Sequence, residues 1–131
     1  MMIDKLAWVH LQDQKILCAR SHGNDTYYFP GGKREAGESD EAALLREIKE
    51  ELNVDLRPET LRYLGQFAAQ AHGRALGVLV QMTCYTADYA GVLTPTSEIA
   101  EIAWLGYDDK ERTSLVAHQI FDWLKERDLL A

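Results

Sequence analysis

The stretch FPGGKREAGESDEAALLREIKEELNV (residues 29–54) decides the fold, because a sharp Pro-Gly-Gly turn leads directly into an acidic segment. It holds six glutamates and one aspartate. Ser39 is a suitable N-cap, and the carboxylates of Asp40 and Glu41 suit the positive end of a helix dipole. The pattern predicts a helix that begins after Ser39 and runs to about Leu52.

The predicted helix has two different faces. At about 100° per residue, one side carries an apolar stripe that suits a core, formed by Leu44, Leu45, Ile48 and Leu52. Spacings of three and four residues gather Glu47, Glu50 and Glu51 on an adjacent face, with Arg46 beside them. Such a face is either simply solvated or a site for a hard cation, because Mg²⁺ and Mn²⁺ prefer oxygen ligands. The helix alone leaves both interpretations open.

The composition places limits on the class of protein. With 131 residues, 47% of them hydrophobic, the chain is expected to form one folded domain over residues 1–131. The balance of 14 basic and 21 acidic residues gives a formal net charge of −7, which argues against binding to a nucleic acid polymer. Cys18 and Cys84 lie in separate apolar runs and are interpreted as buried thiols.

The amino-terminal segment lacks a basic start followed by a continuous apolar stretch, so no signal peptide is predicted. No apolar run approaches the length that a membrane-spanning helix needs. We therefore expect a cytoplasmic protein without membrane contacts; the sequence leaves the oligomeric state open.

The other elements predict an α/β fold. A hairpin is expected from residues 6–12 and 15–21, and residues 26–29 read as a short strand before the turn. Three further strands and a second helix follow, near residues 61–72, 75–87, 101–107 and 114–126. Strands that flank one helix and precede another favour an α/β sandwich around a mixed β-sheet.

The spacing of the polar residues is more specific than their composition. The pattern G-x5-E-x7-R-E-U-x-E-E-x-G-U, in which U is a bulky aliphatic residue, is matched at Gly32, Glu38, Arg46, Glu47, Ile48, Glu50, Glu51 and Val54. This arrangement resembles the signature of the Nudix hydrolase family, and chain length and strand order extend the resemblance over nearly the whole chain. Asn53 stands where the family usually has glycine, and asparagine also tolerates a left-handed helix end.

The resemblance implies a Nudix-type α/β/α sandwich and a hydrolase that requires Mg²⁺ or Mn²⁺. Such enzymes cleave a phosphoanhydride bond of a nucleoside diphosphate linked to another group. The substrate is then a small nucleotide, which can meet a cluster of carboxylates only when cations lie between them.

By the same resemblance, Glu50 and Glu51 are the main metal ligands, and Glu47 is a further ligand or the base that activates water. The backbone carbonyl of Gly31 adds an oxygen ligand. A downstream loop is expected to supply Glu98 as a metal ligand or general base, although a plain surface glutamate is the alternative reading there.

Two residues are expected to support these ligands. Arg46 orients the glutamates through charge-assisted hydrogen bonds, and Glu38 braces the turn against the helix. Ordinary salt bridging is the alternative for both residues.

Substrate contacts are expected from Arg20, Lys33 and His72, each of which has a structural or solvated alternative. Of the two adjacent tyrosines before the Pro-Gly-Gly turn, Tyr28 is taken to line the pocket for the base, and Tyr27 to pack inward.

The identity of the substrate is approached by elimination. The region GQFAAQAHG (65–73) has neither the proline typical of ADP-ribose hydrolases nor the tyrosine typical of dinucleoside polyphosphate hydrolases. The compact chain is most similar to enzymes that cleave nucleoside triphosphates, ordinary or oxidised. Two alternatives stay open: a nucleotide-sensing module with weak catalysis, and an allylic diphosphate isomerase, which would need additional cysteine and glutamate catalysts.

Overall fold

The computed structural model of the chain describes residues 1–71, 73–96 and 98–131. The helices are α1 (Asp40–Leu52) and α2 (Leu115–Glu126), with short 3-10 helices η1 (Pro58–Thr60) and η2 (Tyr107–Arg112). The strands are β1 (Met2–Trp8), β2 (Leu11–Gln12), β3 (Lys15–Ser21), β4 (Gly31–Gly32), β5 (Asp55–Leu56), β6 (Arg62–Gln70), β7 (Leu79–Thr86), β8 (Tyr89–Ala90) and β9 (Ile99–Leu105).

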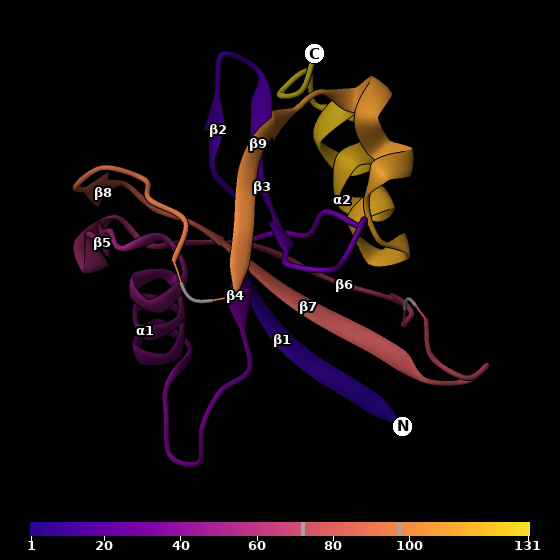
Figure 1. The fold of residues 1–131 in the computed structure, drawn as a ribbon, viewed down its shortest axis with the longest axis horizontal. Coiled ribbons are helices and arrows are strands. Elements are labelled where there is room, and N and C mark those ends of the chain that lie inside the picture. Colours follow the sequence, from indigo (N-terminus) through magenta and orange to yellow (C-terminus); the bar gives the residue numbers. More distant parts are fainter. Residues whose placement is uncertain (72, 97) are drawn as a thin grey trace.

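The strands form a mixed sheet and two smaller antiparallel sheets. The mixed sheet has the order β4-β1-β7-β6, in which β1 and β7 run parallel and the other neighbours antiparallel. The second sheet has the order β2-β3-β9, and β5 pairs with β8. The two long helices lie on opposite sides of the strands (Figure 1). This arrangement confirms the predicted α/β sandwich around a mixed sheet.

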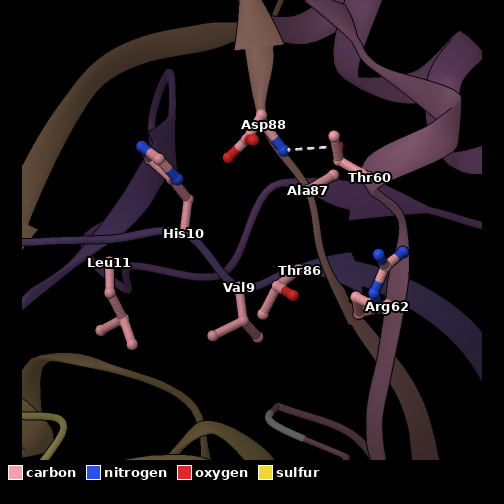
Figure 2. Close-up of a pocket in the computed structure, with 8 residues that line it drawn as sticks. All are labelled: Val9, His10, Leu11, Thr60, Arg62, Thr86, Ala87 and Asp88. Carbon is pink, nitrogen blue, oxygen red and sulfur yellow. Dashed lines mark hydrogen bonds between the residues drawn. The ribbon is translucent and has the colours of Figure 1, made fainter.

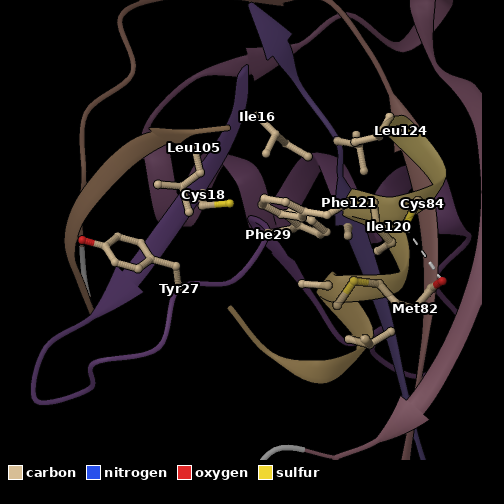
Figure 3. Packing of buried hydrophobic residues seen from close by; sticks show 14 of the residues in the cluster. Ile16, Cys18, Tyr27, Phe29, Met82, Cys84, Leu105, Ile120, Phe121 and Leu124 are labelled. Carbon is tan, nitrogen blue, oxygen red and sulfur yellow. Dashed lines mark hydrogen bonds between the residues drawn. The ribbon is translucent and has the colours of Figure 1, made fainter. Parts of the chain in front are cut away.

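Strand β1 separates two hydrophobic cores because alternate side chains point to opposite faces of a sheet. Leu6 and Trp8 contribute to the core beneath α1, while Ala7 belongs to the core beneath α2. Figure 3 shows the second core, where the rings of Phe29 and Phe121 stack with centroids 6.0 Å apart.

The two cysteines lie inside this architecture. Cys18 and Cys84 are buried members of the core beneath α2, as predicted, and burial raises the pKa of both thiols. Neither thiol is among the described residues that line the pocket at α1, which disfavours the isomerase alternative.

The predicted hairpin forms only at its tip. Asp13 and Gln14 have φ values of 54° and 59°, so they form the tight turn between β2 and β3. The preceding residues up to Trp8 instead run into the mixed sheet as β1. The prediction of one continuous strand over residues 6–12 was therefore wrong, because β1 is hydrogen-bonded on both sides by β4 and β7.

Two other strand boundaries differ from those predicted. Residues 26–29 form no strand: Tyr27 and Tyr28 make isolated bridges to Thr113 and Ala19, with no continuing ladder. The strand expected from residue 75 begins at Leu79, because residues 75–78 make a turn closed by the Val78 amide donating to the Ala75 carbonyl.

The last strand also begins earlier than expected. β9 starts at Ile99, so Glu101 lies within the strand and not at its beginning. Neither long helix, nor any other helix in the described ranges, combines the length and apolarity that crossing a membrane requires.

Candidate active site

The register of the acidic residues is set by the two ends of α1. The Ser39 hydroxyl accepts a hydrogen bond from the Ala42 amide at 3.1 Å, as predicted for an N-cap. At the other end Asn53 adopts a left-handed conformation, with φ 55° and ψ 35°, and its amide donates to the Lys49 carbonyl at 3.1 Å. Asparagine thus performs the helix-ending role for which glycine was expected.

Two glycines allow α1 to approach β1 closely. β4 pairs with β1 through Gly31 opposite Ala7 and Gly32 opposite Leu6. A Cβ on Gly31 would lie 2.1 Å from the Leu6 carbonyl oxygen, and one on Gly32 would lie 2.5 Å from the carboxyl carbon of Glu47. A side chain at Gly31 would meet backbone atoms, and one at Gly32 would displace the Glu47 carboxylate, so the Pro-Gly-Gly turn brings the backbone directly against the glutamates of α1.

Arg46 organises the polar face of α1. Its guanidinium donates two hydrogen bonds of 2.8 Å to the Glu38 carboxylate and a third of 2.8 Å to Glu47. It also reaches the Lys33 carbonyl at 3.2 Å. The Glu38 carboxylate in turn accepts from the Glu35 amide at 2.7 Å, and Arg46 followed by this amide lowers the pKa of Glu38 to about 2. Arg46 and Glu38 therefore connect α1 to the segment that follows the Pro-Gly-Gly turn.

Glu51 is buried, with 6% of its surface exposed, which differs from the expectation that it points away from the core. Its carboxylate accepts a hydrogen bond from the Gly31 amide at 3.1 Å. Burial raises the pKa of Glu51 to about 8, and the charges of Glu47, Glu98 and Glu50 act in the same direction. The helical wheel missed this burial because β4 covers the last turn of α1.

Glu98 is brought to α1 by the segment before β9. The Thr94 and Thr96 amides donate to the carbonyls of Leu52 and Glu51, both at 2.9 Å, and the Thr96 hydroxyl donates to the Glu50 carbonyl. These bonds satisfy carbonyls at the end of α1 that have no partner within the helix.

A pocket of about 590 Å³ opens at this place. The carboxylates of Glu47, Glu51 and Glu98 belong to its lining, together with Gly31 and Gly32. The Glu50 side chain is 58% exposed and lies 3.6 Å from Arg46. The structure thus brings together most of the residues expected as metal ligands, whereas Glu50 is not among the described lining residues.

The carboxylates do not form a closed metal cage as they stand. Within residues 1–71, 73–96 and 98–131, no three His, Cys, Asp or Glu side chains are grouped closely enough to hold a metal ion. The ion pair between Arg46 and Glu47 accounts for part of this arrangement, because it draws one carboxylate toward the guanidinium.

Some of the residues expected to contact substrate line the pocket, and one described residue does not. Tyr28 and Lys33 line the pocket, and the Tyr28 hydroxyl lies 2.9 Å from the Ser21 hydroxyl. Arg20 is absent from the described lining, since its guanidinium donates to Glu101 at 3.0 Å. His72 lies outside the described residues.

Sequence reasoning missed two cations of the pocket, Lys5 and Arg74. Lys5 lies on the same face of β1 as Ile3 and Ala7, both of which contact the core beneath α2. A lysine that alternates with apolar residues in a buried strand is the signal that could have identified it. Arg74 carries no comparable signal because it lies in an irregular connection.

A second cavity, of about 410 Å³, lies where β1 and β7 end (Figure 2). His10, Arg62 and Asp88 are among its lining residues, and the His10 ring stacks on Trp8 with centroids 4.7 Å apart. Asp88 is the single carboxylate in its described lining, so this cavity lacks the acidic cluster of the pocket at α1.

The family model of the NUDIX domain matches residues 5–124. The chain belongs to the NUDIX family. Solved structures agree on the fold: the solution structure of the E. coli ORF135 protein has a TM-score of 0.73 at 24% identity, covering 95% of this chain and 91% of that protein. The match to the family model confirms the family resemblance that the spacing of the glutamates had indicated.

Two curated NUDIX-like relatives match over shorter stretches. The 8-oxo-dGTP diphosphatase of Proteus vulgaris is 48% identical over 42 residues, which is 32% of this chain and 38% of the relative. The Bacillus subtilis (strain 168) protein YtkD, provisionally named an 8-oxo-dGTP diphosphatase, is 50% identical over 46 residues, or 35% of this chain and 28% of the relative. The matches thus span less than two fifths of either relative.

Proposed function

We propose that this NUDIX chain is a divalent-cation-dependent hydrolase that cleaves a phosphoanhydride bond of a nucleoside diphosphate linked to another group. The observation that carries the proposal is the buried Glu51 carboxylate, which shares one pocket with Glu47 and Glu98. Like charges in a partly buried space are unfavourable unless a cation joins them. A pocket of this kind suits a phosphate substrate that arrives together with Mg²⁺ or Mn²⁺.

The donor set fits such a cation, because each candidate ligand offers oxygen. Glu47, Glu50, Glu51, Glu98 and the Gly31 carbonyl are the groups that would hold Mg²⁺ or Mn²⁺. When bound, the cation would offset the charge of the phosphates and make a water molecule more acidic. Both Glu47 and Glu50 would have to share their carboxylates with Arg46, which lies 2.8 Å from Glu47 and 3.6 Å from the more exposed Glu50.

The remaining residues of the network have positioning and proton-transfer roles in this proposal. Arg46 holds the turn and the Glu47 carboxylate in position through its hydrogen bonds to Glu38 and Glu47. Glu47 and Glu98 are the two candidates for the base that takes a proton from the attacking water. Both carboxylates line the pocket, so the choice between them is left to mutagenesis.

A nucleoside triphosphate, ordinary or oxidised, is the substrate we propose. The pocket continues past the carboxylates to apolar side chains, including Val80, Met82 and Val116, and to small polar groups such as Asn24 and Ser114. Apolar walls with a few polar groups suit a nucleobase. The two curated relatives are named for the triphosphate 8-oxo-dGTP, which supports the same class.

The test is a screen for phosphate and pyrophosphate release with Mg²⁺ or Mn²⁺. The panel contains ordinary and oxidised nucleoside triphosphates, ADP-ribose, nucleotide sugars and dinucleoside polyphosphates. We expect hydrolysis of a triphosphate that EDTA abolishes and that Glu50→Gln strongly reduces, while Glu41→Gln, a matched change on the exposed first turn of α1, retains activity. Binding of nucleotides without release from any substrate would contradict the proposal and favour a nucleotide-sensing module.

A further inference from the structure

We propose that Lys5 is a specificity-determining residue that binds the phosphate chain of the substrate and selects nucleotides with three phosphates. The inference rests on the nucleotide substrate of the proposed function, but it concerns a strand outside the acidic helix. Three observations lead to it: the position of Lys5, its lack of a partner, and the charges that surround it.

The position of Lys5 is fixed by the mixed sheet. Lys5 lies in the middle of β1, opposite Met82 of the parallel strand β7, and its side chain is half-buried. Its neighbour Leu6 pairs with Gly32, so Lys5 is one residue away from the contact between β1 and the Pro-Gly-Gly turn. The side chain lines the same pocket as Glu47 and Glu51. A strand in the centre of a sheet therefore holds this cation rigidly beside the carboxylates.

Lys5 has no ion pair or side-chain hydrogen bond within the part of the chain that the structure describes. Among the described residues, seven of the thirteen other basic side chains form an ion pair with a carboxylate: Arg20, Arg34, Arg46, Lys49, Lys110, Arg112 and Arg127. Partly burying an ammonium group without a hydrogen-bond partner is unfavourable. A half-buried lysine left unpaired in a pocket is therefore available to a ligand.

The charges around Lys5 indicate an anionic ligand. Burial lowers its pKa, and Lys33 and Arg74 act in the same direction, while Glu51 and Glu98 oppose them. Lys5, Lys33 and Arg74 all line the pocket, so three cations face one space in a chain whose net charge is −7. Mutual repulsion among them is relieved when an anion enters between them.

The amount of positive charge favours a triphosphate over a diphosphate. Divalent cations at the glutamates would be offset mainly by the carboxylates that hold them, so Lys5, Lys33 and Arg74 are the cations that meet the charge of the phosphate chain. A third phosphate adds to that charge, whereas an uncharged group such as a sugar does not. Charge-assisted hydrogen bonds are among the stronger contacts that a side chain can offer to a phosphate oxygen.

The experiment measures binding, so it does not depend on turnover. Calorimetry with Mg²⁺ compares an α,β-imido nucleoside triphosphate with the corresponding α,β-imido diphosphate, for the wild type and for Lys5→Met, Lys5→Arg and Lys15→Met. Lys15 is an exposed lysine at the start of β3 and serves as the matched control. We expect Lys5→Met to weaken the triphosphate analogue by on the order of tenfold to a hundredfold, and the diphosphate analogue by less than about twofold.

Two further results are expected. Lys5→Arg should recover much of the lost affinity, and Lys15→Met should behave as the wild type. An equal loss for both ligands, or no loss, would overturn the inference, as would a wild type that binds both ligands equally. A wild type that binds the analogue through Lys5 but hydrolyses no nucleotide would overturn the proposed activity alone. Thermal melting of each variant separates loss of binding from loss of folding.

Discussion

The two long helices cover opposite sides of the sheet, yet their charged residues are used differently. On α2, one carboxylate oxygen of Asp122 accepts from Lys110 at 3.0 Å and from the Tyr107 hydroxyl at 2.8 Å. On α1, the buried Glu51 accepts one hydrogen bond from the described residues, donated by the Gly31 amide. Both helices bury an apolar stripe, so amphipathicity alone does not distinguish them.

The difference comes from the elements that meet the polar face of each helix. η2 brings Lys110, whose charge balances that of Asp122, and Tyr107, whose hydroxyl donates a further hydrogen bond. β4 brings only the neutral Gly31 amide to Glu51, and the segment before β9 brings Glu98, which adds negative charge. A charged helix face can serve as a binding site when the neighbouring elements leave its charge uncompensated. Substitutions on the two helices test this contrast.

The largest effect is expected for Glu51→Gln. Glutamine keeps the bond from the Gly31 amide but loses the charge, so kcat/KM should fall at least about a thousandfold, equivalent to about 4 kcal/mol of transition-state stabilisation. Asp122→Asn on α2 should change kcat/KM less than about twofold. Steady-state product release measures both. Activity near the wild-type level in Glu51→Gln would end the assignment of this residue.

The next effect concerns the free energy of unfolding, which we expect to depend strongly on the buried apolar side chains of α2. Phe121 is fully buried and stacks on Phe29, so Phe121→Ala should lower the free energy of unfolding by about 3 to 4 kcal/mol. Urea unfolding gives the value, with Leu115→Ala at the exposed start of α2 as control. If hydrolysis by the folded fraction of Phe121→Ala no longer depended on Mg²⁺ or Mn²⁺, the core beneath α2 would not be independent of the site at α1.

A third prediction uses the raised pKa of Glu51 in protein freed of metal by EDTA. Because its pKa is about 8 when folded and about 4.5 when unfolded, the folded state holds a proton that the unfolded state releases across this range. Stability should therefore decrease steadily as the pH rises from about 4.5 to about 8. Urea titrations at several pH values test this decrease, which should be absent from Glu51→Gln.

The smallest effect concerns the carboxyl ends of the two helices. Asn53 after α1 and Asp128 after α2 have φ values of 55° and 57°, a region in which glycine meets no steric penalty. Asn53→Gly and Asp128→Gly should each raise the unfolding free energy by less than about 1 kcal/mol. Thermal melting can detect the shift. Strong destabilisation of Asn53→Gly alone would show that its side chain has a separate role.

Local signals in the sequence predicted α1 well. Ser39 supplies the cap, Asn53 the left-handed end, and the spacing of apolar residues the buried stripe, because each depends on residues within a few positions of one another. The same holds for the turn at Asp13 and Gln14. Contacts between distant segments were predicted less well: β1 left the expected hairpin because its partners β4 and β7 are remote in sequence.

The candidate site shows the same difference between local signals and contacts made by distant segments. Spacing placed Glu47 and Glu51 on neighbouring turns of a helix, and the family resemblance pointed to Glu98, which lies in the segment before β9 and lines the same pocket. It could not show that Arg20 is occupied by Glu101, nor that Lys5 faces the pocket from β1. Both facts depend on strand pairing, which a local pattern does not specify.

By itself, the sequence determined the family, the acidic helix and the composition of the carboxylate cluster, since spacing and helical period are local properties of the chain. Only the tertiary structure decided how the charges are compensated. Burial of Glu51 beneath β4, attachment of the Glu98 segment to α1 and the unpaired state of Lys5 within the described residues all follow from long-range packing. Electrostatic energies depend on distance and solvent exposure, and both are set by how segments remote in sequence meet.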